Sequence, residues 1–320
     1  MQHRRIDMSK IYDVIILGAG PAGLAAGLYA GRSMLSTLII EKGQDGGQIA
    51  MTDEIENYPG QMLEGENGVT LVARMAKQAE HFGAERVRDT IQEVSLDGSV
   101  KKVVGNKGEY LGKTIIIATG ASTRPICCKN EDKYTGAGIS YCATCDGMFF
   151  RGLEVFVVGG GDAAVEEAIF LTKFARKVTI IHRRDQLRAA RSIQEKAFAN
   201  EKIAFLWDSV LDEVDGDDVL NKLVVKNVKT GELTTIEADP EEGMFGVFCF
   251  IGMHPNSTLF EGQLPLERGY IRTDEDMRTP IPGVYAAGDI RVKSLRQVVT
   301  AVADGAIAAM QAEKYLAEQE

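Results

Sequence analysis

The feature that most restricts the fold of this 320-residue chain is a strand, glycine-loop and helix pattern that occurs twice. In the first copy, the apolar stretch 12–17 leads into Gly18-Ala19-Gly20-Pro21-Ala22-Gly23, and an Ala-rich helical stretch follows to about Arg32. Glycines in this order let the backbone approach a pyrophosphate, which the positive N-terminus of the helix stabilises. The pattern predicts a dinucleotide site whose phosphate loop contains Gly18, Gly20, Pro21, Ala22 and Gly23.

An acidic residue follows where such sites bind a ribose. The apolar run Leu38-Ile39-Ile40 ends in Glu41, which stands 23 residues after Gly18. A carboxylate at this offset accepts hydrogen bonds from the hydroxyls of a ribose that has no 2′-phosphate, as in FAD or NAD. A lone glycine motif is weak evidence and a structural turn is the alternative, but strand, helix and acidic residue in sequence favour the nucleotide.

The second copy carries the opposite charge at the ribose position. The run 154–158 leads into Gly159-Gly160-Gly161-Asp162-Ala163-Ala164, and the next apolar run ends in His182-Arg183-Arg184. A 2′-phosphate needs cationic donors, so the arginines favour NADPH over NADH, with a solvated basic helix start as the alternative. The residues predicted to bind NADPH are Gly159, Gly161, Asp162, Ala163, Ala164, His182, Arg183, Arg184 and Arg188.

Between the two copies lies the stretch Cys142-Ala143-Thr144-Cys145-Asp146. A disulfide across two residues closes so small a ring that its entropic stabilisation is only about 2 kcal/mol. Each thiol can lower the other's pKa, and the thiolate is the attacking form, so redox exchange is the predicted use. Asp146 can accept and return the proton of this exchange, with a helix or turn cap as the alternative.

Composition excludes several other classes of protein. The net charge of −10 offers no electrostatic footprint for nucleic acid, and the longest apolar runs are far too short to span a membrane. The first ten residues are polar and unlike a secretion signal, and five cysteines suit a reducing cytoplasm with one specific redox pair. A zinc site is disfavoured because Cys127 and Cys128 are adjacent, and with Cys249 they are interpreted as buried or bystander thiols. No metal is expected.

Taken together, these motifs resemble the low-molecular-weight, bacterial and archaeal type of thioredoxin reductase within the pyridine nucleotide-disulfide oxidoreductase family, over about Ile11 to Leu316. The resemblance rests on Gly18 to Gly23, Gly46-Gly47-Gln48, Asn57-Tyr58-Pro59-Gly60, Ala118-Thr119-Gly120, Cys142 to Gly147, Gly159 to Ala164, His182 to Arg188, Gly288-Asp289 and Arg296-Gln297.

The resemblance implies an α/β fold of two Rossmann-like, three-layer domains, with an NADPH domain inserted in an FAD domain. Residues 1–10 would be an N-terminal extension, residues 11–123 and 251–320 the FAD domain, and residues 124–250 the NADPH domain with the dithiol. Hinges are expected near 119–125 and 243–255, which are rich in Gly, Pro or small residues.

The resemblance also implies further FAD contacts. Asp289 would bond the ribityl or pyrophosphate region, and Gln48, Asn57 and Gln297 would line the flavin, although Asn57 also suits a plain turn. His254 stands in a Met-His pair that departs from the usual pattern, so it is expected to be a loop histidine. The remaining residues implied for FAD are Lys42, Gly47, Ala118, Thr119, Gly120, Gly288, Arg296 and Val298.

The implied activity is NADPH-dependent reduction of thioredoxin, which maintains cell redox homeostasis. Electrons would pass from NADPH to FAD and then to the Cys142–Cys145 disulfide, with Cys145 facing the flavin and Cys142 attacking thioredoxin. The inserted domain would rotate between half-reactions, and a homodimer is the family expectation. Three alternatives remain. A ferredoxin-fed reductase or a small-molecule dithiol oxidase should lack the second glycine motif or the arginines, and both are present here. A reductase of another protein partner and a flavin-bound redox sensor that is no enzyme stay open.

Overall fold

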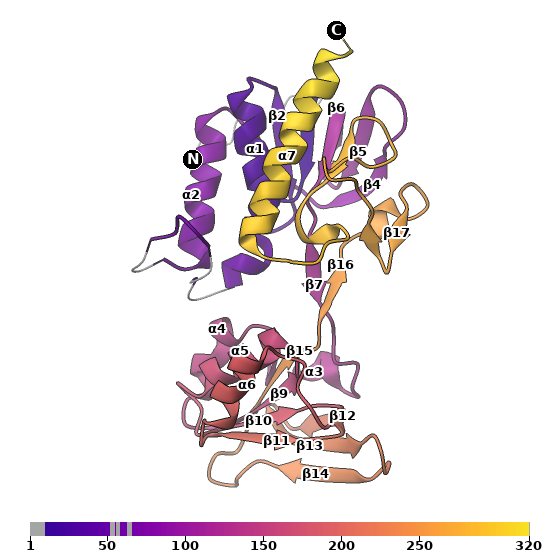
Figure 1. Cartoon of the computed structure of the whole chain (residues 1–320). Helices are drawn as coiled ribbons and strands as arrows, with labels where there is room; N and C mark the ends of the chain where they lie inside the picture. Colours follow the sequence, from indigo (N-terminus) through magenta and orange to yellow (C-terminus); the bar gives the residue numbers. More distant parts are fainter. Residues whose placement is uncertain (1–9, 52–54, 56–57, 63–65, 320) are drawn as a thin grey trace. The chain divides into compact units, whose positions relative to one another are not determined.

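The computed structural model describes residues 10–51, 55, 58–62 and 66–319, without the side chains of Met51, Thr144 and Cys145. The chain divides into two compact units. Unit 1 combines the residues before Thr123 with those from His254 onward, and unit 2 is Thr123–Met253. Figure 1 labels the main helices and strands of each unit. Nearly all of the predicted extension 1–10 lies outside the described residues.

Unit 1 is built on a mainly parallel sheet with the strand order β3-β2-β1-β6-β5-β4, in which β19 also pairs with β6. Strands β1, β2, β3, β6 and β19 run parallel, whereas β4 and β5 are antiparallel to their neighbours. The bounds are β1 Ile11–Leu17, β2 Thr37–Glu41, β3 Glu85–Arg88, β4 Ile91–Ser95, β5 Lys101–Gly105, β6 Glu109–Ile117 and β19 Val284–Ala286.

The parallel strands of unit 1 are apolar along their length because both sheet faces are covered. Val14 and Ile16 face a core shared with α1, α2 and α7, while Ile15 and Leu17 face a second core shared with β4, β5 and Phe260. Helices α1 and α7 touch closely, since a Cβ on Gly305 would lie 2.0 Å from the Ala22 carbonyl oxygen. The bounds are α1 Pro21–Arg32, α2 Gly68–His81, α7 Val298–Ala317, η1 Gly47–Met51, η3 Thr258–Phe260, η4 Gly288–Ile290, β17 Leu266–Glu267 and β18 Tyr270–Ile271.

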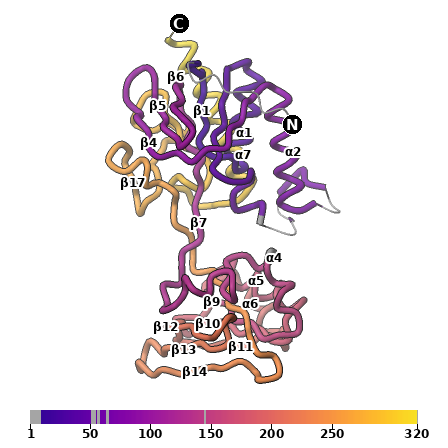
Figure 2. Tube along the Cα trace, turned by 180° about the vertical axis from the view of Figure 1, so that it is seen from behind, coloured from indigo at the N-terminus to yellow at the C-terminus, as the bar shows by residue number. Residues whose placement is uncertain are grey.

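Unit 2 repeats this plan with a parallel sheet of order β11-β10-β9-β15-β8. One face packs on α5 and α6, and the other packs on the antiparallel strands β12, β13 and β14, which Figure 2 shows from behind. The predicted α/β class is confirmed. The bounds are α3 Glu131–Tyr134, β8 Ile139–Ser140, α4 Ala143–Asp146, η2 Gly147–Phe150, β9 Glu154–Gly159, α5 Asp162–Leu171, β10 Lys177–Ile181, α6 Arg191–Phe198, β11 Ile203–Leu206, β12 Ser209–Gly216, β13 Leu220–Asn227, β14 Leu233–Glu237 and β15 Gly246–Phe250.

The two connecting segments pair with one another as β7 (Ala121–Thr123) and β16 (Met253–Pro255). The second predicted hinge, 243–255, is too long, because Gly246–Phe250 forms β15, which pairs with both β8 and β9 inside the sheet of unit 2. Only the residues after Phe250 connect the units there. No helix in the described part of the chain is long and apolar enough to cross a bilayer.

Candidate functional site

The carboxyl edge of the unit 1 sheet opens into a cavity of about 700 Å³. Apart from Gly23, every predicted FAD residue that the structure describes lines it, and Asn57 lies outside the described residues. The lining residues that the sequence singled out are Gly18, Gly20, Pro21, Ala22, Glu41, Lys42, Gly47, Gln48, Ala118, Thr119, Gly120, Gly288, Asp289, Arg296, Gln297 and Val298.

The first glycine loop is shaped by close backbone contacts. Gly18 has φ +108°, and a Cβ there would lie 2.4 Å from the carbonyl oxygen of Ala118 on the neighbouring strand's end. A Cβ on Gly23 would lie 1.9 Å from the Gly18 carbonyl oxygen, so Gly23 lets α1 begin directly against the loop. The loop thus places the N-terminus of α1 at the cavity, where it can bind an anion.

Glu41 joins the end of β2 to this loop. Its Oε2 accepts a hydrogen bond from the Ala19 amide at 2.8 Å, and its Oε1 accepts one from the Gly43 amide at 3.0 Å. An ionised carboxylate has about four acceptor positions, so two can still receive ligand hydroxyls. Glu41 is therefore held in place for a ribose by bonds that leave it free acceptor capacity.

Asp289 and Arg296 carry buried polar atoms that the described residues leave unsatisfied. Asp289 Oδ1 and Arg296 Nε are both inaccessible to solvent and have no protein hydrogen-bond partner there. Burial raises the pKa of Asp289, and Lys293 and Arg296 oppose this shift. Such unsatisfied groups cost stability unless a ligand pairs with them. A carboxylate acceptor, a guanidinium donor, a ribose-binding Glu41 and a helix N-terminus together fit the hydroxyl, phosphate and ring groups of FAD.

Asp89 and Asn256 are among the polar residues of the cavity that the sequence reasoning missed, and the others are Gln44, Thr90 and Ser122. Asp89 directly follows β3, so its position after a parallel strand was a usable signal. Asn256 Nδ2 donates to the Thr119 carbonyl at 2.9 Å, and its Oδ1 accepts from Ser122 Oγ at 2.8 Å. No local pattern predicts a contact between residues 137 positions apart in the sequence.

The second glycine loop, in unit 2, has the same construction. A Cβ on Gly159 would lie 2.5 Å from the Phe250 carbonyl oxygen, which requires glycine there. Asp162, the first residue of α5, accepts from the Ala190 amide at 2.6 Å, and the Arg188 amide donates to the Gly160 carbonyl at 2.6 Å. These bonds hold the arginine segment beside the loop. Ala164 is buried in the core behind α5.

The four basic residues of this site differ in exposure. Arg183, Arg184 and Arg188 are exposed, whereas His182 is only 5% exposed. The His182 ring lies beneath Gly160, where an added Cβ would be 2.4 Å from it. Burial and the neighbouring arginines lower the pKa of His182, so the ring is neutral at pH 7. The arginines are available to a 2′-phosphate, and His182 supports the loop from below.

Two hydrogen bonds with Ser140 hold the backbone of Cys142 at the start of the dithiol stretch. The Cys142 amide donates to Ser140 Oγ at 3.0 Å, and Ser140 Oγ donates to the Cys142 carbonyl at 3.1 Å. Cys142 is disulfide-bonded, while the Cys145 side chain lies outside the described part. Asp146 is the last residue of α4 and directly precedes η2, which its side chain does not cap with a hydrogen bond.

The thiols of Cys128 and Cys249 are less reactive than an ordinary cysteine thiol. Burial is the main cause that raises the pKa of both Cys128 and Cys249 to about 12. Both are therefore protonated and weakly nucleophilic at neutral pH. Cys127 is exposed and free. Among the described residues, no group of His, Cys, Asp or Glu side chains is arranged to hold a metal ion.

Asp289 generates a testable trade-off between stability and binding. Replacing it by Asn should stabilise the flavin-free protein at neutral pH by about 1 kcal/mol, because the desolvated charge of a carboxylate whose Oδ1 has no partner is removed. The same change should weaken FAD binding about tenfold by removing a charged acceptor. Thermal unfolding of the apoprotein and FAD titration measure the two effects.

The pH dependence gives the control for this prediction. A raised folded-state pKa of Asp289 favours folding below the ordinary carboxyl pKa of about 4 and loses that benefit as the pH rises. The gain in stability of Asp289→Asn should therefore vanish in acid. A variant that is less stable than the parent at neutral pH would show that Asp289 is already well paired.

Comparison with known proteins places this geometry in a family. The family model described as pyridine nucleotide-disulphide oxidoreductase matches residues 12–305. A thioredoxin reductase of Peptoclostridium litorale is 58% identical over 97% of this chain and 99% of its own length, and that of Bacillus subtilis (strain 168) is 50% identical over 97% and 96%. The Lactococcus lactis thioredoxin reductase, solved in an FR conformation, is 47% identical, with a TM-score of 0.89 over 96% of this chain and 99% of that one. The chain therefore belongs to the pyridine nucleotide-disulphide oxidoreductase family.

Proposed function

We propose that this chain is an NADPH-dependent thioredoxin reductase. The observation that carries the proposal is that Cys142, in a disulfide, and the arginine-flanked glycine loop both belong to unit 2, whereas the cavity that suits FAD belongs to unit 1. When bound, FAD would take two electrons from a reduced nicotinamide and release them to a disulfide. Full-length relatives named thioredoxin reductase support thioredoxin as the protein substrate.

The residues of unit 1 would bind and orient the flavin. Glu41 would accept from the adenosine ribose, the N-terminus of α1 would receive the pyrophosphate, and Asp289 would accept from the ribityl or pyrophosphate region. Gln48, Asn57 and Gln297 would line the ring. Each role uses an acceptor or donor type that matches the ligand group.

The residues of unit 2 would bind NADPH, which is the source of the electrons, and would carry the disulfide that receives them from the flavin. Arg183, Arg184 and Arg188 would select NADPH through its 2′-phosphate. Hydride transfer brings two electrons and one proton, and reduction of the disulfide to two thiols takes two electrons and two protons. Asp146 would supply or relay the additional proton. Cys142 then attacks the thioredoxin disulfide, and Cys145 resolves the mixed disulfide.

The distribution of these groups implies alternation between two arrangements. The nicotinamide and the dithiol are both held by unit 2, and each must reach the same flavin in unit 1. The dithiol must also meet a protein substrate. We infer that unit 2 rotates about the paired segments β7 and β16 between the two half-reactions.

A homodimer and a cytoplasmic location belong to the same proposal. The free thiols of Cys127, Cys128 and Cys249 suit a reducing compartment. Thioredoxin reduction in that compartment would contribute to cell redox homeostasis.

The decisive experiment is anaerobic titration of the FAD-loaded protein with NADPH or NADH, followed by oxidised thioredoxin. NADPH should bleach the flavin absorbance and thioredoxin should restore it, with a Cys142→Ser variant as the control that accepts electrons but cannot pass them on. Bleaching by reduced ferredoxin alone would favour a ferredoxin-fed reductase. Bleaching without transfer to thioredoxin would favour another partner or a sensor.

The arginines should determine which dinucleotide is used. Arg183→Ala combined with Arg184→Ala should raise the KM for NADPH by about tenfold or more and leave that for NADH nearly unchanged, because only 2′-phosphate contacts are lost. Steady-state kinetics with both dinucleotides measure this. Arg176→Ala is a matched control, since this exposed arginine pairs with Glu242 at 2.6 Å and precedes β10, at the opposite end of the strand. An equal loss with both dinucleotides would contradict the assignment.

Rotation should be necessary for turnover. A cleavable chemical crosslink between the units, verified by mass spectrometry, should abolish steady-state reduction of thioredoxin, and its cleavage should restore the activity. A monofunctional reagent with the same reactive group controls for modification alone. Full turnover by the crosslinked protein would rule the rotation out.

A further inference from the structure

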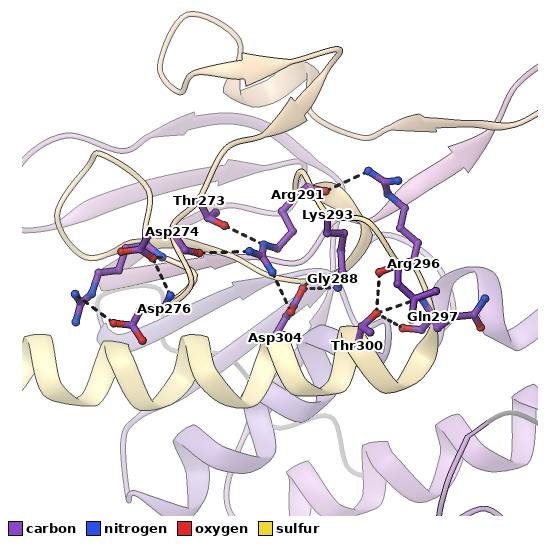
Figure 3. A network of polar contacts seen from close by, with 12 residues as sticks. Thr273, Asp274, Asp276, Gly288, Arg291, Lys293, Arg296, Gln297, Thr300 and Asp304 are labelled. Carbon is purple, nitrogen blue, oxygen red and sulfur yellow. Dashed lines mark hydrogen bonds and ion pairs between the residues drawn. The ribbon is translucent and has the colours of Figure 1, made fainter.

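A buried carboxylate in α7 accepts hydrogen bonds from the loop that precedes this helix. Asp304 lies nearly two turns into α7, about seven residues at 3.6 residues per turn, and is only 6% exposed. It accepts hydrogen bonds from the Gly288 amide at 3.0 Å, from Arg291 Nη1 at 3.0 Å and from Lys293 Nζ at 2.7 Å. Figure 3 shows these three donors converging on it. The side chains of Arg291 and Lys293 are themselves largely buried.

This cluster joins two walls of the FAD cavity that are separate in sequence. Gly288 and Asp289, after β19, form one wall, and the start of α7, from Arg296 to Ala301, forms the other. Arg291 extends the connection, because its Nε donates to Thr273 Oγ1 at 2.9 Å and its Nη2 to the Asp274 carbonyl at 3.3 Å. Movement of either wall would therefore break charged hydrogen bonds around Asp304.

The same cluster sets the charge around Asp289. Lys293 and Arg296 stabilise the ionised form of Asp289, and Asp304 opposes it. The other charged side chains that line this cavity are Glu41, Lys42 and Asp89, from the ends of β2 and β3. Lys293 is bonded to Asp304 and so cannot turn away from Asp289 without leaving a buried carboxylate underpaired.

We propose that Asp304, together with Arg291 and Lys293, is a positioning residue of the flavin site, which holds the Gly288–Asp289 turn against the start of α7 so that both walls are formed before FAD binds. The inference rests on the proposed FAD function of this cavity.

The test compares Asp304→Asn with Asp13→Asn. Asp13 is a matched control in unit 1, since it accepts from the Ser36 amide at 2.9 Å and from Lys113 Nζ at 2.8 Å but does not line the cavity. Both variants should lower the Tm of the apoprotein, but only Asp304→Asn should raise the Kd for FAD, by about tenfold for the loss of charged contacts. Equal FAD affinity in the two variants would reduce Asp304 to a stability role and overturn the proposal.

Lys293→Met provides a second measurement that does not depend on the folding of Asp304→Asn. It leaves Asp304 paired with Arg291 and Gly288, and it removes the contact of Lys293 with Asp304 at 2.7 Å. The Kd for FAD should rise in Lys293→Met, because one of the charged contacts that hold the Gly288–Asp289 turn against α7 is lost. An unchanged Kd for FAD in a folded Lys293→Met variant would refute the role of Lys293. A parent protein that does not bind FAD would instead refute the proposed function, so the two failures are distinguishable.

Discussion

The meeting of parallel strand ends at one edge is the constraint on which the cavity of unit 1 depends. Strands β1, β2, β6 and β19 are mutually parallel, so the residues that follow them must emerge together. The residues at these strand ends line the cavity: Glu41 is the last residue of β2, and Gly18, Ala118 and Ala287 directly follow β1, β6 and β19. The close approach of Gly18 to Ala118 is possible only without a side chain at position 18. The parallel alignment of these strands therefore determines both the fold of unit 1 and the position of its cavity.

The buried polar groups of unit 1 are of two kinds: those that have hydrogen-bond partners within the protein and those that do not. Asp13, Asp89 and Asp304 each accept several hydrogen bonds from amides, hydroxyls or cations of the chain. Asp289 Oδ1 and Arg296 Nε are buried without such partners among the described residues. A fold that leaves one carboxylate oxygen and one guanidinium N–H unsatisfied loses stability in exchange for groups that can recognise a ligand. The satisfied Asp304 beside them is what allows the unsatisfied groups to keep their positions.

Local patterns predicted most of the elements, because strand, glycine loop and helix are adjacent in sequence. The strand before Gly18, the helix ending at Arg32 and the strand before His182 all form where periodicity and glycine placement indicate. Contacts that join distant segments had no such signal. Asn256 reaches Thr119, and Asp304 reaches Gly288, through tertiary packing alone. The second hinge was predicted too long for the same reason. The Gly-containing sequence around Gly246 suggested a flexible stretch, but these residues form β15 and pair with β9.

The thiols of unit 2 show how one fold separates reactive from inert cysteine. Cys249 is 1% exposed within β15, and the desolvation of its thiolate raises its pKa to about 12. Cys128 reaches a similar pKa because it is partly buried and because the carboxylate of Glu131 lies near it. Glu131 is itself fixed by the amides of Ile126 and Cys127, so its charge cannot move away. At neutral pH neither thiol is sufficiently ionised to attack a disulfide, whereas Cys142 lies in a disulfide beside Ser140, whose hydroxyl accepts from the Cys142 amide. Burial and a fixed carboxylate thus make Cys128 and Cys249 poor nucleophiles, whereas Cys142 takes part in a disulfide.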